Sequence, residues 1–143
     1  MAESIERLDT VFGLKRQDLH TYSPLTLAYL GDAVYELIVR NMLVKKGNCP
    51  VNRLHREAIQ YVKAGAQAEI MDRLEPLLTE EEAEIFRRGR NAHSATTAKN
   101  ASVADYRRAT GFEALIGWLY LKQDTDRLLE LVRKGLEGGT DQS

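Results

Sequence analysis

The spacing of apolar residues along the chain predicts helices throughout. Apolar and small side chains recur three and four residues apart, and the period-two alternation that marks a strand does not occur. The predicted helices cover about residues 24–46, 51–74 (as one helix or two), 79–88, 102–122 and 125–136, after a shorter helical pattern within 1–20. The pattern therefore predicts an all-α domain.

Capping residues set the predicted boundaries of these helices. Ser23 before Pro24 is typical of an N-cap followed by a proline in the first helical turn. Thr79 with a glutamate three residues later predicts a capping box, and Ser102 with an aspartate three residues later is a second candidate. We expect an N-terminal extension, used for docking or frayed, then one domain and a flexible tail, at residues 1–20, 21–137 and 138–143.

Composition narrows the classes of protein to which the chain can belong. At 143 residues it has room for one ordinary domain. Its formal net charge of -1, from 20 basic and 21 acidic residues, means that any binding of nucleic acid rests on local patches. The single cysteine, Cys49, excludes an intramolecular disulfide, and no Cys/His cluster has zinc-ligand spacing. Because no stretch is apolar enough for a signal peptide or a membrane span, we expect a soluble, cytoplasmic protein.

Two acids stand within otherwise apolar helical stretches. Asp32 lies in LTLAYLGDAVYELIV, and Glu113 lies in FEALIGWLYL. Neither has a basic residue three or four positions away, so no cation on its own helix can pair with it. A buried, unpaired carboxylate costs several kcal/mol, so we expect the two acids to share one site. Together they suit a hard cation such as Mg²⁺ and phosphoryl transfer, whereas the alternative is two core acids satisfied by groups from other helices.

One basic window lies just before Glu113. Residues 86–110 carry six basic residues and one acid, and we interpret this window as the only strong local charge excess of the chain. Within it the small, polar stretch GRNAHSATTAKNA, residues 89–101, predicts a loop. Guanidinium and hydroxyl groups of this kind bind phosphates and ribose hydroxyls, although a solvated loop is the alternative. The candidate RNA-binding residues are Arg88, Arg90, Lys99 and Arg108.

The residues around both acids resemble the ribonuclease III family. YLGDA at residues 29–33 is similar to the family signature, and FEAL at 112–115, followed by a glycine and Tyr-Leu, is similar to its second motif. The stretches RRGRNAHSATTAKN and YRRATGFEAL, with a chain that ends where longer members continue into an RNA-binding domain, resemble the short Mini-III ribonucleases.

The resemblance implies a ribonuclease III-like helical bundle that acts as a homodimeric, Mg²⁺-dependent endoribonuclease. Such an enzyme cuts both strands of double-stranded RNA, and the subfamily implies trimming of precursor 23S ribosomal RNA, with or without a ribosomal protein. The motifs make Asp32 and Glu113 the catalytic, metal-binding residues. The family also has acids where this chain has Ala28 and Thr110, so we expect weaker Mg²⁺ binding, with Glu36, Asp105 or a partner residue as replacements.

Two other functions are compatible with parts of the sequence. A catalytically inactive, RNA-binding or ribosome-associated helical module would account for the acids missing at Ala28 and Thr110, but not for the acids kept at Asp32 and Glu113. A helical hydrolase of small nucleotides would need several histidines or paired acids, and the three histidines are not spaced as ligands.

Overall fold

The computed structural model describes residues 2–92 and 102–140, and this part of the chain is helical without a strand. This confirms the predicted all-α fold. In chain order the elements are α1 (Ala2–Phe12), η1 (Leu19–Thr21), α2 (Pro24–Val44), α3 (Val51–Val62), α4 (Ala64–Leu74), η2 (Glu75–Leu77), α5 (Glu80–Arg90), α6 (Val103–Leu121) and α7 (Thr125–Thr140).

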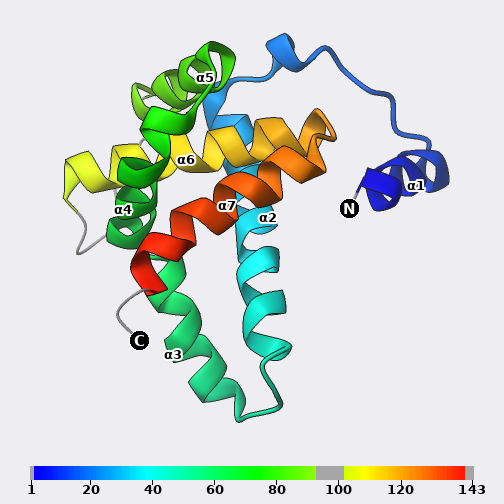
Figure 1. Cartoon of the computed structure of the whole chain (residues 1–143). Helices are drawn as coiled ribbons and strands as arrows, with labels where there is room; N and C mark the ends of the chain where they lie inside the picture. Colours follow the sequence, from blue (N-terminus) through cyan, green and yellow to red (C-terminus); the bar gives the residue numbers. More distant parts are fainter. Residues whose placement is uncertain (1, 93–101, 141–143) are drawn as a thin grey trace.

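Helix α6 is the centre of the bundle. It packs against α2, α4, α5 and α7, and it crosses α2 near the N-terminal end of that helix (Figure 1). Because neighbours surround it, α6 is apolar on nearly every side, and Phe112, Leu115 and Leu119 along it are fully buried. Tyr35 on α2 meets Phe112 edge-on, with ring centroids 5.0 Å apart, and donates a hydrogen bond to the Tyr61 carbonyl oxygen of α3 at 2.8 Å. These contacts fix the helices that carry Asp32 and Glu113.

The predicted caps are present at the helix N-termini. Ser23 Oγ accepts a hydrogen bond from the Thr26 backbone N–H at 3.2 Å, and Thr79 forms the predicted capping box with Glu82. Ser102 Oγ accepts from the Asp105 backbone N–H at 3.0 Å. The stretch predicted as one helix or two is two, because Lys63 adopts extended backbone angles (φ -63°, ψ 153°) between α3 and α4.

The prediction of a loop beginning at Gly89 was wrong. Helix α5 continues through this glycine to Arg90, and Gly89 is buried against α6. A Cβ at this position would stand 2.8 Å from both the Gly111 Cα and the Ala114 Cβ. Glycine is therefore needed here for close packing of α5 on α6 rather than for ending a helix. The rest of the predicted loop, from residue 93, lies outside the described residues.

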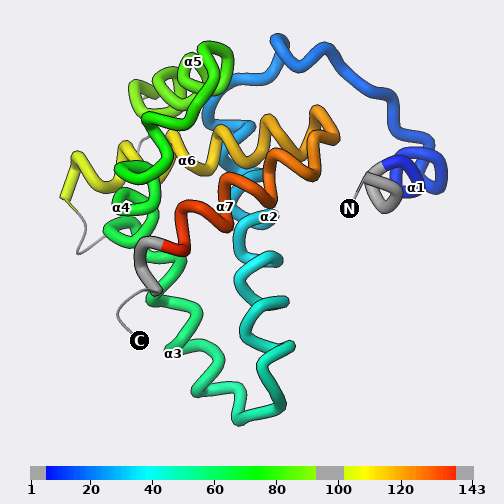
Figure 2. The backbone as a smooth tube through the Cα atoms, viewed as in Figure 1, coloured from blue at the N-terminus to red at the C-terminus, as the bar shows by residue number. Residues whose placement is uncertain are grey.

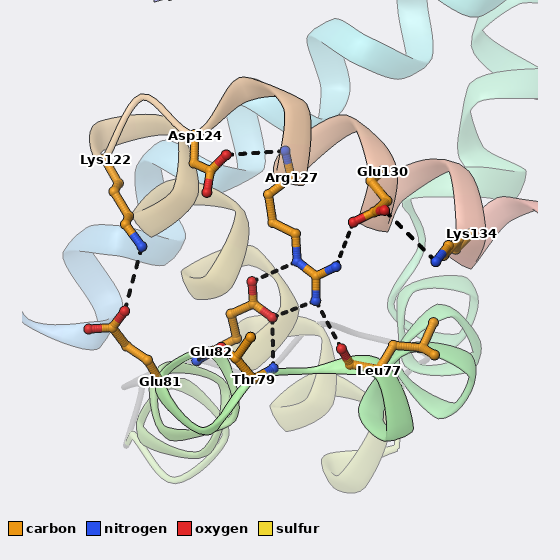
Figure 3. A network of polar contacts seen from close by, with 9 residues as sticks. All are labelled: Leu77, Thr79, Glu81, Glu82, Lys122, Asp124, Arg127, Glu130 and Lys134. Atoms are coloured by element: carbon orange, nitrogen blue, oxygen red, sulfur yellow. Dashed lines mark hydrogen bonds and ion pairs between the residues drawn. The ribbon is translucent and has the colours of Figure 1, made fainter.

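A buried ion pair joins α5 to α7. Arg127 of α7 donates from Nε and Nη2 to the Glu82 carboxylate at 2.8 Å each, and from Nη2 to the Leu77 carbonyl oxygen at 2.9 Å (Figure 3). The Glu82 carboxylate also accepts from the Thr79 backbone N–H at 2.9 Å, so its two oxygens are satisfied. The hydrogen bonds from Arg127, opposed in part by burial, hold the pKa of Glu82 below its ordinary value.

Two parts of the chain project from the bundle. Helices α2 and α3 run side by side as a long hairpin, and α1 lies beyond the ends of α6 and α7 (Figure 2), where Leu8 lines a cavity with Tyr120. In the single chain the apolar side chains of Leu8, Val11 and Phe12 on α1 are exposed. None of the helices within residues 2–92 and 102–140 has the length and apolar character needed to cross a membrane.

Candidate active site

Asp32 and Glu113 meet where α2 crosses α6. The crossing is so close that a Cβ on Gly31 would lie 1.7 Å from the Glu113 carbonyl oxygen, and a Cβ on Gly117 would lie 2.0 Å from the Leu27 carbonyl oxygen. Both distances are below any real carbon contact, so glycine is required on each helix. Because Asp32 follows Gly31 directly, the backbone contact brings its carboxylate close enough to that of Glu113 to raise the pKa of Glu113. The structure thus unites the two acids that the sequence singled out.

The two acids differ in exposure, and this corrects one expectation. Glu113 is half-buried, as an acid in an apolar helix should be, but Asp32 is exposed. The apolar stretch around Asp32 is buried on one side only: Tyr29, one turn earlier, is 83% exposed, and Leu37 is also exposed. Asp32 is therefore not a buried charge, and its carboxylate is open to a ligand from solvent.

Burial and like charge act together on Glu113. Desolvation first, and then the neighbouring Asp32 carboxylate, raise the pKa of Glu113 to about 8, with a further small increase from Glu36. A hydrogen bond from Gln67 acts in the opposite direction. Two close acids without a basic partner repel each other, and a bound cation relieves this repulsion. The site is therefore built to gain from a positive ligand.

The donor set fits a hard divalent cation held by few protein atoms. Within residues 2–92 and 102–140 no cluster of three or more His, Cys, Asp or Glu side chains is arranged to hold a metal. Asp32 and Glu113 nevertheless offer adjacent carboxylate oxygens, and such cations accept carboxylate and water together. Asp32 and Glu113 are the residues that would hold the ion, with water completing its coordination.

At the two positions where the ribonuclease III pattern has a further acid, this chain has no carboxylate. Ala28 is buried, and the Thr110 hydroxyl donates to the Tyr106 carbonyl oxygen of its own helix at 3.0 Å. Asp105 lies two turns before Glu113 on α6, about 12 Å along the axis. Glu36 is close enough to raise the Glu113 pKa and also forms the predicted pair with Arg40, at 3.5 Å. Of the expected replacements within this chain, Glu36 is the one near the site.

The predicted RNA-binding residues fall into different settings. Arg88 lies in the last turn of α5, as predicted, and Arg90 lies there too rather than in the predicted loop. The Arg90 guanidinium lies over the Phe86 ring, 5.6 Å from its centroid. Arg108 pairs with Asp72 at 2.8 Å and with Glu75 at 2.5 Å, so its charge is neutralised within the fold. Lys99 lies outside the described residues.

A second stretch of the sequence has the same charge excess as residues 86–110. Residues 40–63 also carry six basic residues and one acid, so our assignment of a single strong charge excess was wrong. A count of charges along the sequence could have found this stretch. We missed it because its basic residues are spread over the end of one helix, a turn and the next helix. The structure gathers them on the α2–α3 hairpin, where Lys45, Lys46 and Arg56 are exposed. The sequence therefore has two basic windows, of which the structure describes the second in full.

Comparison with known proteins is consistent with this site. Residues 25–124 match the family described as Ribonuclease III domain. The chain is 50% identical over 119 residues to a Mini-ribonuclease 3 of Clostridium tetani, covering 82% of this chain and 79% of that protein. It is 49% identical over 124 residues to a Mini-ribonuclease 3 of Thermoanaerobacter sp. (strain X514), covering 87% of each.

A solved structure supports the fold. A crystal structure of a Fusobacterium nucleatum protein superposes with a TM-score of 0.75 at 31% identity, over 82% of this chain and 90% of that one. Members of the matched family act on double-stranded RNA, generally with a divalent metal ion and usually as dimers. The chain belongs to the ribonuclease III family, among the Mini-ribonuclease 3 proteins, and is an endoribonuclease of double-stranded RNA.

Proposed function

We propose that Asp32 and Glu113 are the catalytic, metal-binding residues and that the ion they hold is Mg²⁺. The observation that carries this proposal is the pair of adjacent carboxylates, without a basic partner, at the glycine crossing of α2 and α6. When bound, Mg²⁺ lowers the pKa of a coordinated water and neutralises negative charge on the phosphate. The small donor set favours an ion that keeps several waters.

Asp32 and Glu113 have different roles in the proposed site. Asp32, being exposed, is the acid that a phosphodiester can approach, and its exposed neighbour Ala33 is small enough to admit an RNA backbone. Glu113 lies deeper and is held by the fold, so it sets the position of the second oxygen ligand. Its pKa, raised to about 8, favours the protonated form of Glu113 at neutral pH, and a bound cation would favour the carboxylate.

The proposed natural substrate is a stem of precursor 23S ribosomal RNA, the substrate implied by the subfamily. The cations that contact the duplex would be Arg88 and Arg90 at the end of α5, Lys99, and Lys45 and Lys46 on the α2–α3 hairpin. A-form RNA is held through phosphates and 2′-hydroxyls with little reading of bases, so stem shape would decide where the enzyme cuts. Measuring the cleavage rate of the free stem and of the stem bound by ribosomal proteins tests whether such a protein assists the enzyme.

We also propose a homodimer that pairs through the exposed face of α2. Leu25 and Tyr29 are exposed on the same side of the helix as Asp32, and Leu37 and Val44 are exposed further along it, on a neighbouring side. Apolar side chains exposed along one helix favour contact with a second copy, and two-fold pairing would place two acid pairs along one duplex. Tyr29→Asp should convert the dimer to monomer in sedimentation, whereas Ile59→Asp on exposed α3 should not.

The deciding experiment compares wild type, Asp32→Asn and a matched control, Asp126→Asn, which lies exposed on α7. Each is incubated with an end-labelled RNA duplex in Mg²⁺ and in EDTA, and the products are resolved on a denaturing gel. Wild type and Asp126→Asn should cut both strands in Mg²⁺ alone, and Asp32→Asn should bind RNA without cutting it. Wild-type cleavage by Asp32→Asn would contradict the role given to this acid. Binding without cleavage by wild type in every metal would favour the inactive RNA-binding module.

A further inference from the structure

Gln67 is a buried amide that the proposed mechanism leaves without a role. It lies in the first turns of α4 and is 2% exposed. Among the described residues, the other buried polar side chains are Glu82 and Thr110, and each has a structural hydrogen bond. Gln67 differs because one of its amide atoms, Oε1, is buried without a hydrogen-bond partner. A leucine or methionine would fill this place without leaving an acceptor unsatisfied.

The amide nitrogen of Gln67 links the end of α3 to the acid pair. Nε2 donates to the Val62 carbonyl oxygen at 2.9 Å and makes a longer contact, 3.5 Å, with Glu113 Oε2. Val62 is the last residue of α3, where carbonyl groups lack helical partners, so it gives the amide a fixed anchor. One N–H is taken by this anchor, and the second is left for the carboxylate. The break between α3 and α4 at Lys63 creates this anchor next to the site.

We propose that Gln67 is a positioning residue that orients the Glu113 carboxylate for the metal ion. The inference rests on the proposed function of Glu113 as a metal ligand. With alanine and threonine at positions 28 and 110, fewer protein oxygens share the ion, so the orientation of each remaining ligand counts for more. Groups that hydrogen-bond to metal ligands fix the direction of their lone pairs, and their loss commonly weakens metal binding 10–100-fold. Gln67 is placed to do this from outside the coordination sphere.

The test replaces Gln67 with methionine, which keeps the length of the side chain and removes both hydrogen-bonding atoms. Binding of Mn²⁺, used as a probe divalent ion, is measured by calorimetry on the full-length protein without RNA. Cleavage rates are measured separately against Mg²⁺ concentration. We expect the Gln67→Met variant to bind Mn²⁺ about 10–100-fold more weakly. We also expect it to need correspondingly more Mg²⁺ for half-maximal cleavage, with RNA affinity in EDTA unchanged.

A matched control separates positioning from a general loss of packing. Tyr35→Phe removes a comparable buried hydrogen bond to the adjacent Tyr61 carbonyl oxygen, but Tyr35 makes no contact with Glu113 among the described interactions. This control should lower the melting temperature without changing metal affinity. If the methionine variant does not fold, Gln67→Asn is measured in its place. Its amide is one methylene too short to reach both partners, so it should also weaken metal binding.

The outcomes distinguish this inference from the proposed function. Wild-type metal affinity in a folded Gln67→Met variant overturns the positioning role, even if wild type cleaves RNA as proposed. An equal loss of metal affinity in Tyr35→Phe overturns it as well. If wild type binds divalent ions but Asp32→Asn and Glu113→Gln bind them equally well, it is the proposed metal site that fails.

Discussion

Gly31 of α2 and Gly117 of α6 pack backbone to backbone. A Cβ on Gly31 would lie 2.8 Å from the Gly117 backbone nitrogen, and a Cβ on Gly117 would lie 3.1 Å from the Gly31 backbone nitrogen. Each would also collide with a carbonyl oxygen of the facing helix. The two helices therefore approach to a distance that short acidic side chains can bridge, which is how Asp32 and Glu113 come to share one site.

Adding a single methyl group at this crossing should separate the two helices. We expect Gly31→Ala and Gly117→Ala each to lower the free energy of unfolding by about 3 kcal/mol or more, because the clash is with backbone that cannot move alone. Chemical denaturation monitored by circular dichroism measures this change. RNA cleavage per folded molecule should fall as well, because the acids move apart.

Gly65 provides the matched control for the crossing. It also lies in a helix, but a Cβ there would meet nothing nearer than the Asp105 carboxylate, at 3.7 Å. Gly65→Ala should therefore leave stability unchanged or raise it by up to about 1 kcal/mol, as helix propensity predicts. If Gly31→Ala behaved like Gly65→Ala, the crossing would not be as close as described.

The acid pair could be predicted from the sequence because acids in apolar helices are conspicuous. The close approach of α2 and α6 that unites them could not be predicted, because a glycine in a sequence can mark either a loop or a close contact between helices. Gly89, a helix-packing residue, was predicted to begin a loop. Asp32 was expected to be buried because the apolar stretch does not reveal that one side of α2 is exposed. Gln67 gave no signal, since its role depends on a contact 46 residues away in the chain. Local patterns thus predicted the elements and the acids, and tertiary contacts determined the rest.

The stability of the metal-free protein should depend on the ionisation of Glu113. Its pKa is about 8 in the folded chain against an ordinary 4.5, so between these values the folded state binds more protons than the unfolded state. The contribution of this group is therefore fully favourable below pH 4.5 and is lost as pH rises through 8. In EDTA, urea unfolding from pH 5 to pH 9 should show this decline for wild type and a smaller one for Glu113→Gln. Parallel curves for the two proteins would contradict the raised pKa.

The pair between Glu82 and Arg127 should stabilise the fold without taking part in catalysis. Removing one partner leaves the other charge poorly compensated, so Glu82→Ala should lower the free energy of unfolding by roughly 2–4 kcal/mol. The pKa of Glu82 is lowered, so its contribution is present above its ordinary value of 4.5 and is lost as pH falls through the folded value. Cleavage per folded molecule should not change.

Glu84 on the same helix is the control for this ion pair. It pairs with Arg87 at 2.9 Å, but its side chain is 58% exposed, so solvent screens the interaction. Glu84→Ala should change stability by less than about 1 kcal/mol. A cost as large as that of Glu82→Ala would mean that exposure does not separate the two pairs.

The salt dependence of RNA binding should distinguish cations that contact phosphate from cations used by the fold. Arg88 has no ion pair among the described interactions, so Arg88→Ala should weaken binding and reduce the salt slope by about one. Arg108 is held by Asp72 and Glu75, so Arg108→Ala should lower stability and leave the slope nearly unchanged. Arg90 contacts the Phe86 ring, so its replacement should also cost some stability, unlike that of Arg88.

The same measurement decides whether the hairpin surface takes part. Lys45 and Lys46 are exposed at the end of α2, about 20 Å along the helix axis from Asp32. If the bound duplex extends past the dimer face of α2 to this end of the hairpin, Lys45→Ala with Lys46→Ala should reduce the salt slope by about two. An unchanged slope would confine RNA to the end of α5. Because the two windows of the sequence carry the same charge excess, net charge does not identify the one that binds RNA, and the salt slopes of these variants do.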